Sequence, residues 1–281
     1  MTNAKTINTV LASAVALLST EEGALEAQLL LQHVLNVNLA WLIAHENDAL
    51  QANIHDVFEA FLKRRLNGEP IAYIVGYREF YGLKLKVTAE TLIPRPDTET
   101  LVEAALFMIP ENQPSKILDL GTGTGAIALA IAKYRPLTLV TGVDASQAAL
   151  NIAIENAQNL NITNVHFLLS DWFTALHGNT FDVIMSNPPY IETCDEHLKQ
   201  GDLRFEPISA LASGMDGLDD IRAIIAQVPQ HFNPFGWLLL EHGYNQASKV
   251  ADLLKQSGFS NISHCQDLAG IYRVTIGQMP N

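Results

Sequence analysis

The feature that most constrains the fold is an alternation of strand and helix patterns that begins near residue 97. Short β-branched apolar runs predict strands, and longer runs of helical periodicity separate them. Strands connected in this way form a mostly parallel sheet covered on both faces, with ligands beyond the carboxyl ends of the strands. The predicted strands are 116–120, 138–143, 165–169, 181–186, 237–241, 261–265 and 271–276, and the predicted helices are 125–134, 146–159, 221–228 and 246–256.

The first 72 residues predict a small helical bundle instead. Val10–Leu18 has only one basic residue before it and an acidic amphipathic segment after it, so we expect a helix there and not a signal peptide. Ser19 and Glu22 fit a capping box that would open the next helix. Asn53 is the expected cap of a further helix, whose apolar residues from Ile54 to Leu66 form one stripe.

Residues 73–95 differ from both neighbouring regions. Tyr73–Val75 and the residues that follow favour β structure, and Gly82 separates them from the alternating run Leu83–Val87. We therefore expect a β-hairpin that connects the helical bundle to an α/β domain spanning residues 96–281. The hairpin region carries the only basic island of the chain, which is either a solvated surface or a contact for a partner (Arg78, Lys84, Lys86, Arg95).

Composition excludes several classes of protein. The chain has 281 residues and a net charge of −13, which disfavours non-specific binding to phosphate backbones. Its two cysteines are too few for a disulfide framework and lack metal-site spacing, and the nine histidines form no tight ligand pair, so no metal site is expected. No apolar run reaches the roughly 18 residues of a membrane span. These features favour a cytoplasmic protein.

A glycine-rich loop is the first motif with chemical content. It closes the strand that ends at Leu120 and opens a helix, and glycines there let the backbone turn tightly and touch a ligand. Asp144 ends the next strand and can accept hydrogen bonds from ribose hydroxyls. This motif alone fits both an NAD site and an S-adenosylmethionine site. The candidate cofactor residues of the loop are Gly121, Thr122, Gly123, Thr124 and Gly125.

The second motif, Asn187-Pro188-Pro189-Tyr190, follows the strand 181–186 and favours methyl transfer. The Asn187 side-chain oxygen and the Pro188 carbonyl can hold the two hydrogens of an NH₂ group, and Tyr190 offers an aromatic face. The nitrogen of an amide or aryl amine is a poor nucleophile because its lone pair is delocalised. Fixing both N–H bonds can aim that lone pair at an electrophilic methyl group.

Asp171 and Trp172 follow the strand 165–169 and complete the candidate cofactor site. The Asp171 carboxylate can accept a hydrogen bond from an adenine amine, and the indole can pack on the ring. A buried tryptophan is also a common core residue, and that alternative stays open.

Together these motifs resemble a class I S-adenosylmethionine-dependent methyltransferase. The stretch Leu92–Glu99, with Phe80-Tyr81-Gly82 before it, is similar to the HemK/PrmC family. The resemblance implies a Rossmann-like, mostly parallel seven-stranded sheet, and a protein-(glutamine-N5) methyltransferase that acts on the Gly-Gly-Gln motif of peptide chain release factors. It further implies that residues 1–72 help to recognise that protein and that Asn187–Tyr190 hold the glutamine.

Three alternatives are kept. An Asn-Pro-Pro-aromatic motif also suits an exocyclic amine of adenine or cytosine in DNA or RNA, although the acidic chain lacks a basic stripe for such a substrate. An NAD-dependent oxidoreductase and a non-catalytic adaptor fit the second motif poorly. The resemblance implies that Arg95, Asp97 and Glu99 lie near the active site, and an ion-pair latch between domains is the simpler explanation of these charges.

Overall fold

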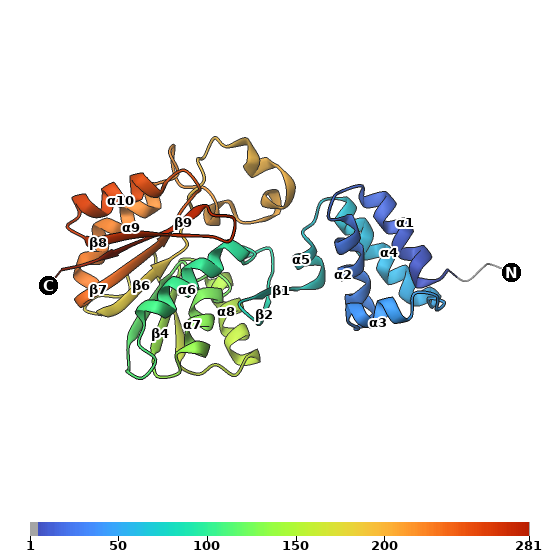
Figure 1. The fold of residues 1–281 in the computed structure, drawn as a ribbon, viewed down its shortest axis with the longest axis horizontal. Coiled ribbons are helices and arrows are strands. Elements are labelled where there is room, and N and C mark those ends of the chain that lie inside the picture. Colours follow the sequence, from blue (N-terminus) through green and yellow to red (C-terminus); the bar gives the residue numbers. More distant parts are fainter. Residues whose placement is uncertain (1–4, 281) are drawn as a thin grey trace. The chain divides into compact units, whose positions relative to one another are not determined.

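A computed structural model describes residues 5–280 and divides the chain into two compact units (Figure 1). The first unit ends at Gly76 and the second begins at Tyr77. The division lies four residues beyond the boundary at residue 72 that the sequence predicts. Residues 77–95 of the predicted hairpin region belong to the second unit. No helix among residues 5–280 is long and apolar enough to cross a membrane.

The first unit is a bundle of helices around its own apolar core. Phe58 and Leu62 of the fourth helix pack there against Leu30 and Leu31 of the second. The buried Glu26 carboxylate is paired with Arg65 at 2.7 Å. The helices are α1 (Ile7–Leu18), α2 (Gly23–Leu35), α3 (Leu39–Ala44), α4 (Ala52–Leu66) and α5 (Ile71–Val75).

Helix ends in this unit correct two predictions. Ser19 does not open α2; it ends α1, with a left-handed φ of 50° and its N–H bonded to the Val15 carbonyl. The residue before α2 is Glu22, which makes no side-chain cap bond. Helix α4 begins before Asn53, because Gln51 already adopts the extended conformation of a cap. The predicted helix of residues 10–18 is present as α1.

The β-favouring residues Tyr73–Val75 are helical, which corrects the prediction of β structure there. Pro70 supplies a fixed φ just before α5, and Gly76 ends the helix with a φ of 82° and its N–H on the Ala72 carbonyl. These flanking residues override the intrinsic preference of a short apolar segment.

The hairpin predicted after this helix is present in the second unit. Strands β1 (Tyr77–Phe80) and β2 (Leu83–Lys86) pair antiparallel. Buried Asn156 of helix α8 (Gln147–Asn159) accepts from the Lys86 N–H at 2.7 Å and donates to its carbonyl at 3.1 Å. The Lys86 ammonium is bound to Glu155, so part of the predicted basic island is neutralised within the unit.

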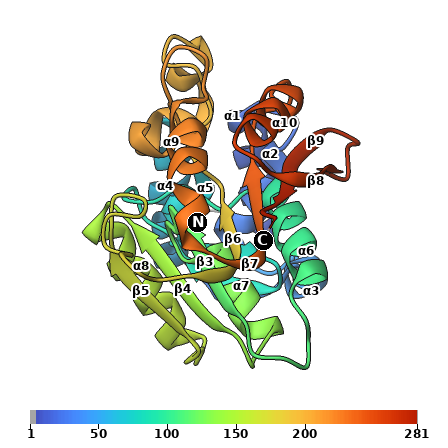
Figure 2. The same ribbon diagram turned by 90° about the vertical axis from the view of Figure 1, so that its left-hand side faces the viewer.

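The main sheet has seven strands in the order β5-β4-β3-β6-β7-β9-β8 (Figure 2). Strand β9 runs opposite to the other six strands, which all point in the same direction. The predicted mostly parallel α/β fold is therefore confirmed. The strands are β3 (Lys116–Leu120), β4 (Leu139–Asp144), β5 (Val165–Leu169), β6 (Phe181–Ser186), β7 (Phe232–Glu241), β8 (Ser260–Gln266) and β9 (Tyr272–Gln278).

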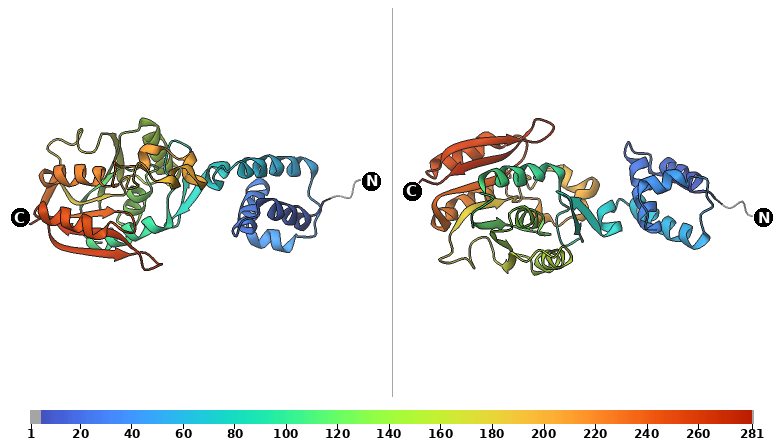
Figure 3. Two further views of the ribbon diagram at one scale, coloured as in Figure 1. Left: turned by 90° about the horizontal axis from the view of Figure 1, so that it is seen from above. Right: turned by 60° about the horizontal axis from the view of Figure 1, so that its bottom comes forward.

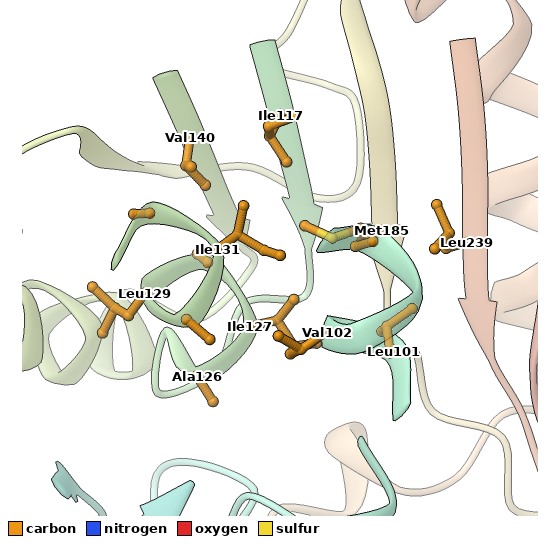
Figure 4. Close-up of a cluster of buried hydrophobic side chains, with 14 of the residues drawn as sticks. Leu101, Val102, Ile117, Ala126, Ile127, Leu129, Ile131, Val140, Met185 and Leu239 are labelled. Carbon is orange, nitrogen blue, oxygen red and sulfur yellow. The ribbon is translucent and has the colours of Figure 1, made fainter. Parts of the chain in front are cut away.

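Helices cover both faces of this sheet (Figure 3). On one face, α6 (Glu99–Met108) and α7 (Ala126–Tyr134) bury Leu101, Ile127 and Ile131 against Ile117 and Met185 of the strands (Figure 4). The other face is covered by α9 (Asp219–Gln227) and α10 (Ala247–Gln256). The central strands β3 and β6 are buried on both sides, and their sequences are accordingly rich in apolar residues.

Two features of this unit differ from expectation. Helix α6 was not predicted, although its buried Leu101, Val102 and Ala105 have helical spacing. The run Phe232–Gly236, which precedes the predicted strand 237–241, is the first half of β7, and the pairing of β7 with β6 shifts register between Phe181 and Val183. The left-handed φ of 63° at Phe235 belongs to this irregular segment.

Gly125 should be required for packing as well as for its backbone conformation. It has a φ of 81°, and an added Cβ would lie 3.1–3.2 Å from Leu129, Ala153 and Phe167. Gly178 is a matched control, since its φ is 76° and nothing lies within 4 Å of an added Cβ. We expect Gly178→Ala to lower the free energy of unfolding by about 1 kcal/mol and Gly125→Ala by about 2–4 kcal/mol. Equal losses in chemical denaturation would contradict the packing argument.

Candidate functional site

The candidate site lies at the carboxyl edge of the sheet, where four neighbouring strands end in register. The residues that follow the last shared row, in the order β4, β3, β6, β7, are Asp144, Gly121, Asn187 and Glu241. Parallel pairing thus brings together side chains that are separated by up to 120 positions in sequence.

A pocket of 460 Å³ opens at this edge. The structure brings seven of the predicted site residues into its wall: Gly121, Gly123, Asp144, Asp171, Trp172, Asn187 and Pro189. Other parts of the wall were not assigned to the site by sequence reasoning. They include Glu90, Thr91 and Leu92 before α6, and Pro207, Ser209 and Ala210 in the long connection after β6.

The other predicted loop residues face inward. Thr122 is buried, and its hydroxyl donates to the Asp119 carboxylate at 2.6 Å. Thr124 is buried and its carbonyl accepts from Asn156 at 3.0 Å. Gly125 opens helix α7 against the packed side chains described above. These three residues shape the loop and do not line the pocket.

The Asp144 carboxylate is held by the backbone. Its Oδ2 accepts from the Gly123 N–H at 2.9 Å, and its Oδ1 accepts from the Ser146 N–H at 2.8 Å. Burial raises the pKa of Asp144, and these backbone bonds oppose the rise. Each oxygen keeps a second lone pair that can accept a hydroxyl hydrogen from a ligand in the pocket.

Trp172 has a left-handed φ of 46°, which is uncommon for a bulky residue. The Ser170 hydroxyl stabilises this turn by donating to the Trp172 carbonyl at 2.8 Å and accepting from the Ala175 N–H at 3.0 Å. The turn directs the indole over Gly121, where an added Cβ would lie 3.6 Å from the ring. Trp172 therefore forms part of the pocket wall, and it also packs against one of the buried clusters.

The Asn187-to-Tyr190 segment leaves the sheet at the edge of the pocket. Asn187 and Pro189 line the pocket, and the Asn187 amide nitrogen donates to the Thr98 hydroxyl at 3.1 Å. Pro188 is buried. Tyr190 is absent from the pocket wall; its hydroxyl donates to Glu241 at 3.4 Å, and burial raises its pKa well above the usual range.

The backbone around Tyr190 is fixed by residues far away in sequence. The Gln246 side chain donates to the Tyr190 carbonyl at 3.0 Å. An added Cβ on Gly217 would lie 2.2 Å from that same carbonyl, so only glycine fits there. These contacts restrain the segment at its Tyr190 end.

The three charged residues at the start of α6 are bonded within the second unit. Arg95 pairs with Glu206, Asp97 pairs with Arg273 at 2.8 Å, and the Glu99 carboxylate accepts from the Tyr81 N–H at 2.8 Å. These bonds fix the start of α6 against other parts of the second unit.

Sequence reasoning did not identify Thr98, Glu206, Glu241 or Gln246 as parts of this site. Glu241 carried the clearest signal, because it is an acidic residue directly after the apolar run Trp237–Leu240, at the carboxyl end of a predicted strand. Thr98 and Glu206 lie in connections whose course no local pattern reveals, and Gln246 lies at the start of a predicted helix, where nothing in the sequence marks its contact with Tyr190.

The arrangement combines two chemical capacities in one pocket. Glycines without side chains, an acidic residue with free lone pairs and an indole ring can hold a nucleoside. Asn187 lies on the same wall, and its side-chain oxygen can accept a hydrogen bond from an N–H of a second molecule. No group of three or more His, Cys, Asp and Glu side chains within residues 5–280 is placed to bind a metal ion.

Two family patterns match the chain. A family described as "PrmC N-terminal domain" matches residues 9–76, and one described as "Methyltransferase domain" matches residues 111–269. The first match ends at the same residue as the first structural unit.

Individual proteins are also similar. The release factor glutamine methyltransferase of Escherichia coli (strain K12) is 46% identical over 92% of this chain and 94% of its own length. The protein of that name from Pseudomonas aeruginosa is 46% identical over 90% of this chain and 92% of its own length. A methyltransferase structure from Pyrococcus furiosus covers 78% of this chain and 98% of its own, with a TM-score of 0.54 and 19% identity, and so shares the fold.

The buried Asp119 carboxyl should make stability depend on pH. Burial raises its pKa from 3.8 to about 7, so the folded state retains a proton that the unfolded state has lost between these values. Its contribution to stability therefore decreases as pH rises through this window. Asp119→Asn keeps an oxygen for Thr122 and cannot ionise. As pH rises from 4 to 8, the wild type loses this contribution and the variant does not. The unfolding free energy of the variant minus that of the wild type should therefore increase by roughly 2–4 kcal/mol over this range. A difference that is constant with pH would contradict the assignment.

Proposed function

The chain belongs to the release factor glutamine methyltransferase family, and on that premise we propose that it transfers a methyl group to the side-chain amide N5 of a glutamine in peptide chain release factors. The glutamine of a Gly-Gly-Gln motif is the proposed target. Release factors act in translation termination, so the proposed setting is the cytoplasm.

One observation carries this proposal. A residue that can accept hydrogen bonds from an NH₂ group lines the same pocket as the residues that suit a nucleoside. Asn187 shares the pocket wall with Gly121, Asp144 and Trp172. A methyl donor and an amide nitrogen must lie within reach of one another for transfer, and one pocket satisfies this requirement.

The proposed cofactor is S-adenosyl-L-methionine, and the residues present fit it. The Asp144 oxygens retain lone pairs for ribose hydroxyls, and Gly121 and Gly123 leave room where a Cβ would intrude. Asp171 and Trp172 are the proposed contacts of the adenine. When bound, this group supplies an electrophilic methyl. Gly125, Thr122 and Thr124 are proposed to support the loop from behind.

Asn187 and Pro188 are proposed to orient the glutamine amide. The Asn187 side-chain oxygen accepts one N–H bond and the Pro188 carbonyl accepts the other, so that the nitrogen lone pair faces the methyl group. Pro189 stiffens the turn, and the Tyr190 ring provides the neighbouring surface. This orientation replaces a strong base, because the nitrogen becomes acidic once it has acquired the methyl and then releases a proton.

The second candidate substrate is an exocyclic amine of adenine or cytosine, which the same acceptor pair suits. The net charge of −13 disfavours a polyanionic substrate. The relatives with 46% identity carry the name of glutamine methyltransferases, and this also favours the release factor.

A methyl-transfer assay tests the proposal. The protein is incubated with methyl-labelled S-adenosyl-L-methionine and, in separate reactions, with an unmodified release factor, unmethylated DNA and unmethylated RNA. Peptide mass spectrometry then locates the label. We expect the label on the Gly-Gly-Gln glutamine alone. Label on nucleic acid alone would support methyl transfer to an NH₂ group but would contradict the proposal that a release factor is the substrate.

Two variants separate cofactor binding from transfer. Asn187→Ala removes the side-chain oxygen and should lower kcat at least about 100-fold with little change in the cofactor dissociation constant. Asp144→Ala should instead weaken cofactor binding in calorimetry, because the hydroxyl acceptors are lost. Full activity of Asn187→Ala would refute the proposal that the Asn187 oxygen and the Pro188 carbonyl orient the glutamine amide. An unchanged cofactor dissociation constant for Asp144→Ala would refute the proposal that Asp144 binds the ribose.

We further propose that the first unit recognises the release factor. The second unit contains every residue of the pocket wall, so the first unit is free for a different task. The fragment Tyr77–Asn281 should bind the cofactor like the full chain, which also checks its folding, and should show a raised KM for the release factor. A fragment that modifies the release factor as efficiently as the full chain would exclude this role.

A further inference from the structure

The side chain of Asn156 in helix α8 is a buried amide that joins two other segments of the second unit through their backbone. It is 1% exposed. Its oxygen accepts from the Lys86 N–H at 2.7 Å, and its nitrogen donates to the carbonyls of Lys86 at 3.1 Å and Thr124 at 3.0 Å. A backbone N–H only donates and a carbonyl only accepts, so these partners fix which way the amide is turned.

The two residues that Asn156 joins lead to two different parts of the pocket wall. Thr124 lies in the glycine loop, directly after Gly123 of the wall. Lys86 ends strand β2, and the chain then reaches the wall again at Glu90. Asn156 itself is absent from the wall, so it acts on a ligand only through the backbone that it holds.

Strand β2 is a firm anchor for this contact. Leu83 and Leu85 are buried in the same apolar cluster as helix α7, and the strand is paired with β1 along its length. The Lys86 ammonium is also bound to Glu155, the residue before Asn156, at 2.7 Å. The end of β2 is therefore held against α8 by backbone and side-chain contacts together.

The glycine loop needs such an anchor because its backbone has unusual freedom. Gly121, Gly123 and Gly125 all adopt left-handed φ values, of 70°, 54° and 81°. Glycine loses more conformational freedom than any other residue when it is fixed in one conformation. The bond to Thr124, between two of these glycines, restricts the loop before a ligand binds and so reduces the entropy that binding must remove.

We propose that Asn156 is a positioning residue of the cofactor site: its amide joins the glycine loop to the end of strand β2 and holds the loop in the conformation that receives S-adenosyl-L-methionine. This inference rests on the proposed function of the site. The position of Asp144 depends on the same loop, because its carboxylate accepts from the Gly123 N–H at 2.9 Å. A displaced loop therefore also affects the proposed ribose acceptor.

Asn156→Asp tests the proposal, because it keeps the size of the side chain and the acceptor for Lys86 but turns an oxygen toward the two carbonyls. We expect the dissociation constant of S-adenosyl-L-methionine, measured by calorimetry, to rise at least about tenfold. Without cofactor, the backbone amides of residues 121–125 should exchange hydrogen faster than in the wild type. At saturating cofactor and release factor, kcat should stay within about threefold of the wild type, because the bound cofactor orders the loop.

Asn164→Asp is the matched control. The Asn164 amide likewise donates to backbone carbonyls, those of Ala132 at 3.0 Å and Thr138 at 3.2 Å. Asn164 directly precedes β5 and so lies at the amino ends of the strands, opposite the edge that carries the pocket. This variant should also lose free energy of unfolding in chemical denaturation, but its cofactor dissociation constant should equal that of the wild type.

Asn156→Ala supplies a second test that does not depend on the folding of Asn156→Asp. It removes the bond to Thr124 without adding a charge, and alanine suits the interior of a helix. We expect a higher cofactor dissociation constant and faster hydrogen exchange at residues 121–125, again with little change in kcat at saturation.

Four results would count against these proposals in different ways. A wild-type cofactor dissociation constant in both Asn156 variants would overturn the positioning role. An equal rise in Asn164→Asp would also overturn it, since the effect would then not depend on the loop. A lower kcat at saturation with unchanged cofactor affinity would contradict a role in the cofactor site. A wild-type chain that binds no S-adenosyl-L-methionine would overturn the proposed function itself.

Discussion

The site depends on one constraint, the in-register parallel pairing of β4, β3, β6 and β7. Because these strands run in the same direction and end at the same level, the residues that follow them form a single row. Three members of the row, Asp144, Gly121 and Asn187, line the pocket, and the fourth, Glu241, is buried at its end. A shift of register by one residue would turn each side chain to the opposite face and destroy the pocket.

Three carboxyl groups of the second unit, one of them in this row, are buried and incompletely paired. Asp119, Glu206 and Glu241 each have one oxygen without a hydrogen-bond partner within residues 5–280. Burial raises the pKa of all three, to about 7 for Asp119 and Glu241. Buried, incompletely paired carboxyls lower stability, and their position around one pocket suits groups retained to orient the loop and the Asn187 segment.

Much of the second unit could be predicted because its local signals agree with its fold. The strands β3, β5 and β6 have the predicted bounds, since each is an apolar run that ends at a turn signal. Helix ends in the first unit were wrong where several polar residues compete for the cap, as at Ser19 and Asn53. Helix α5 was missed because Pro70 and Gly76 override the β preference of the residues between them.

The sequence by itself determined the order of strands and helices, the glycine loop, and the motif Asn187–Tyr190, because each is encoded by neighbouring residues. Only the tertiary structure decided which residues of the loop face the pocket, and that Pro207 and Ser209 complete its wall. It also decided the partners of Arg95, Asp97 and Thr98. These contacts join segments up to 176 positions apart in sequence, and no local periodicity records which distant side chain will occupy the space beside a given one.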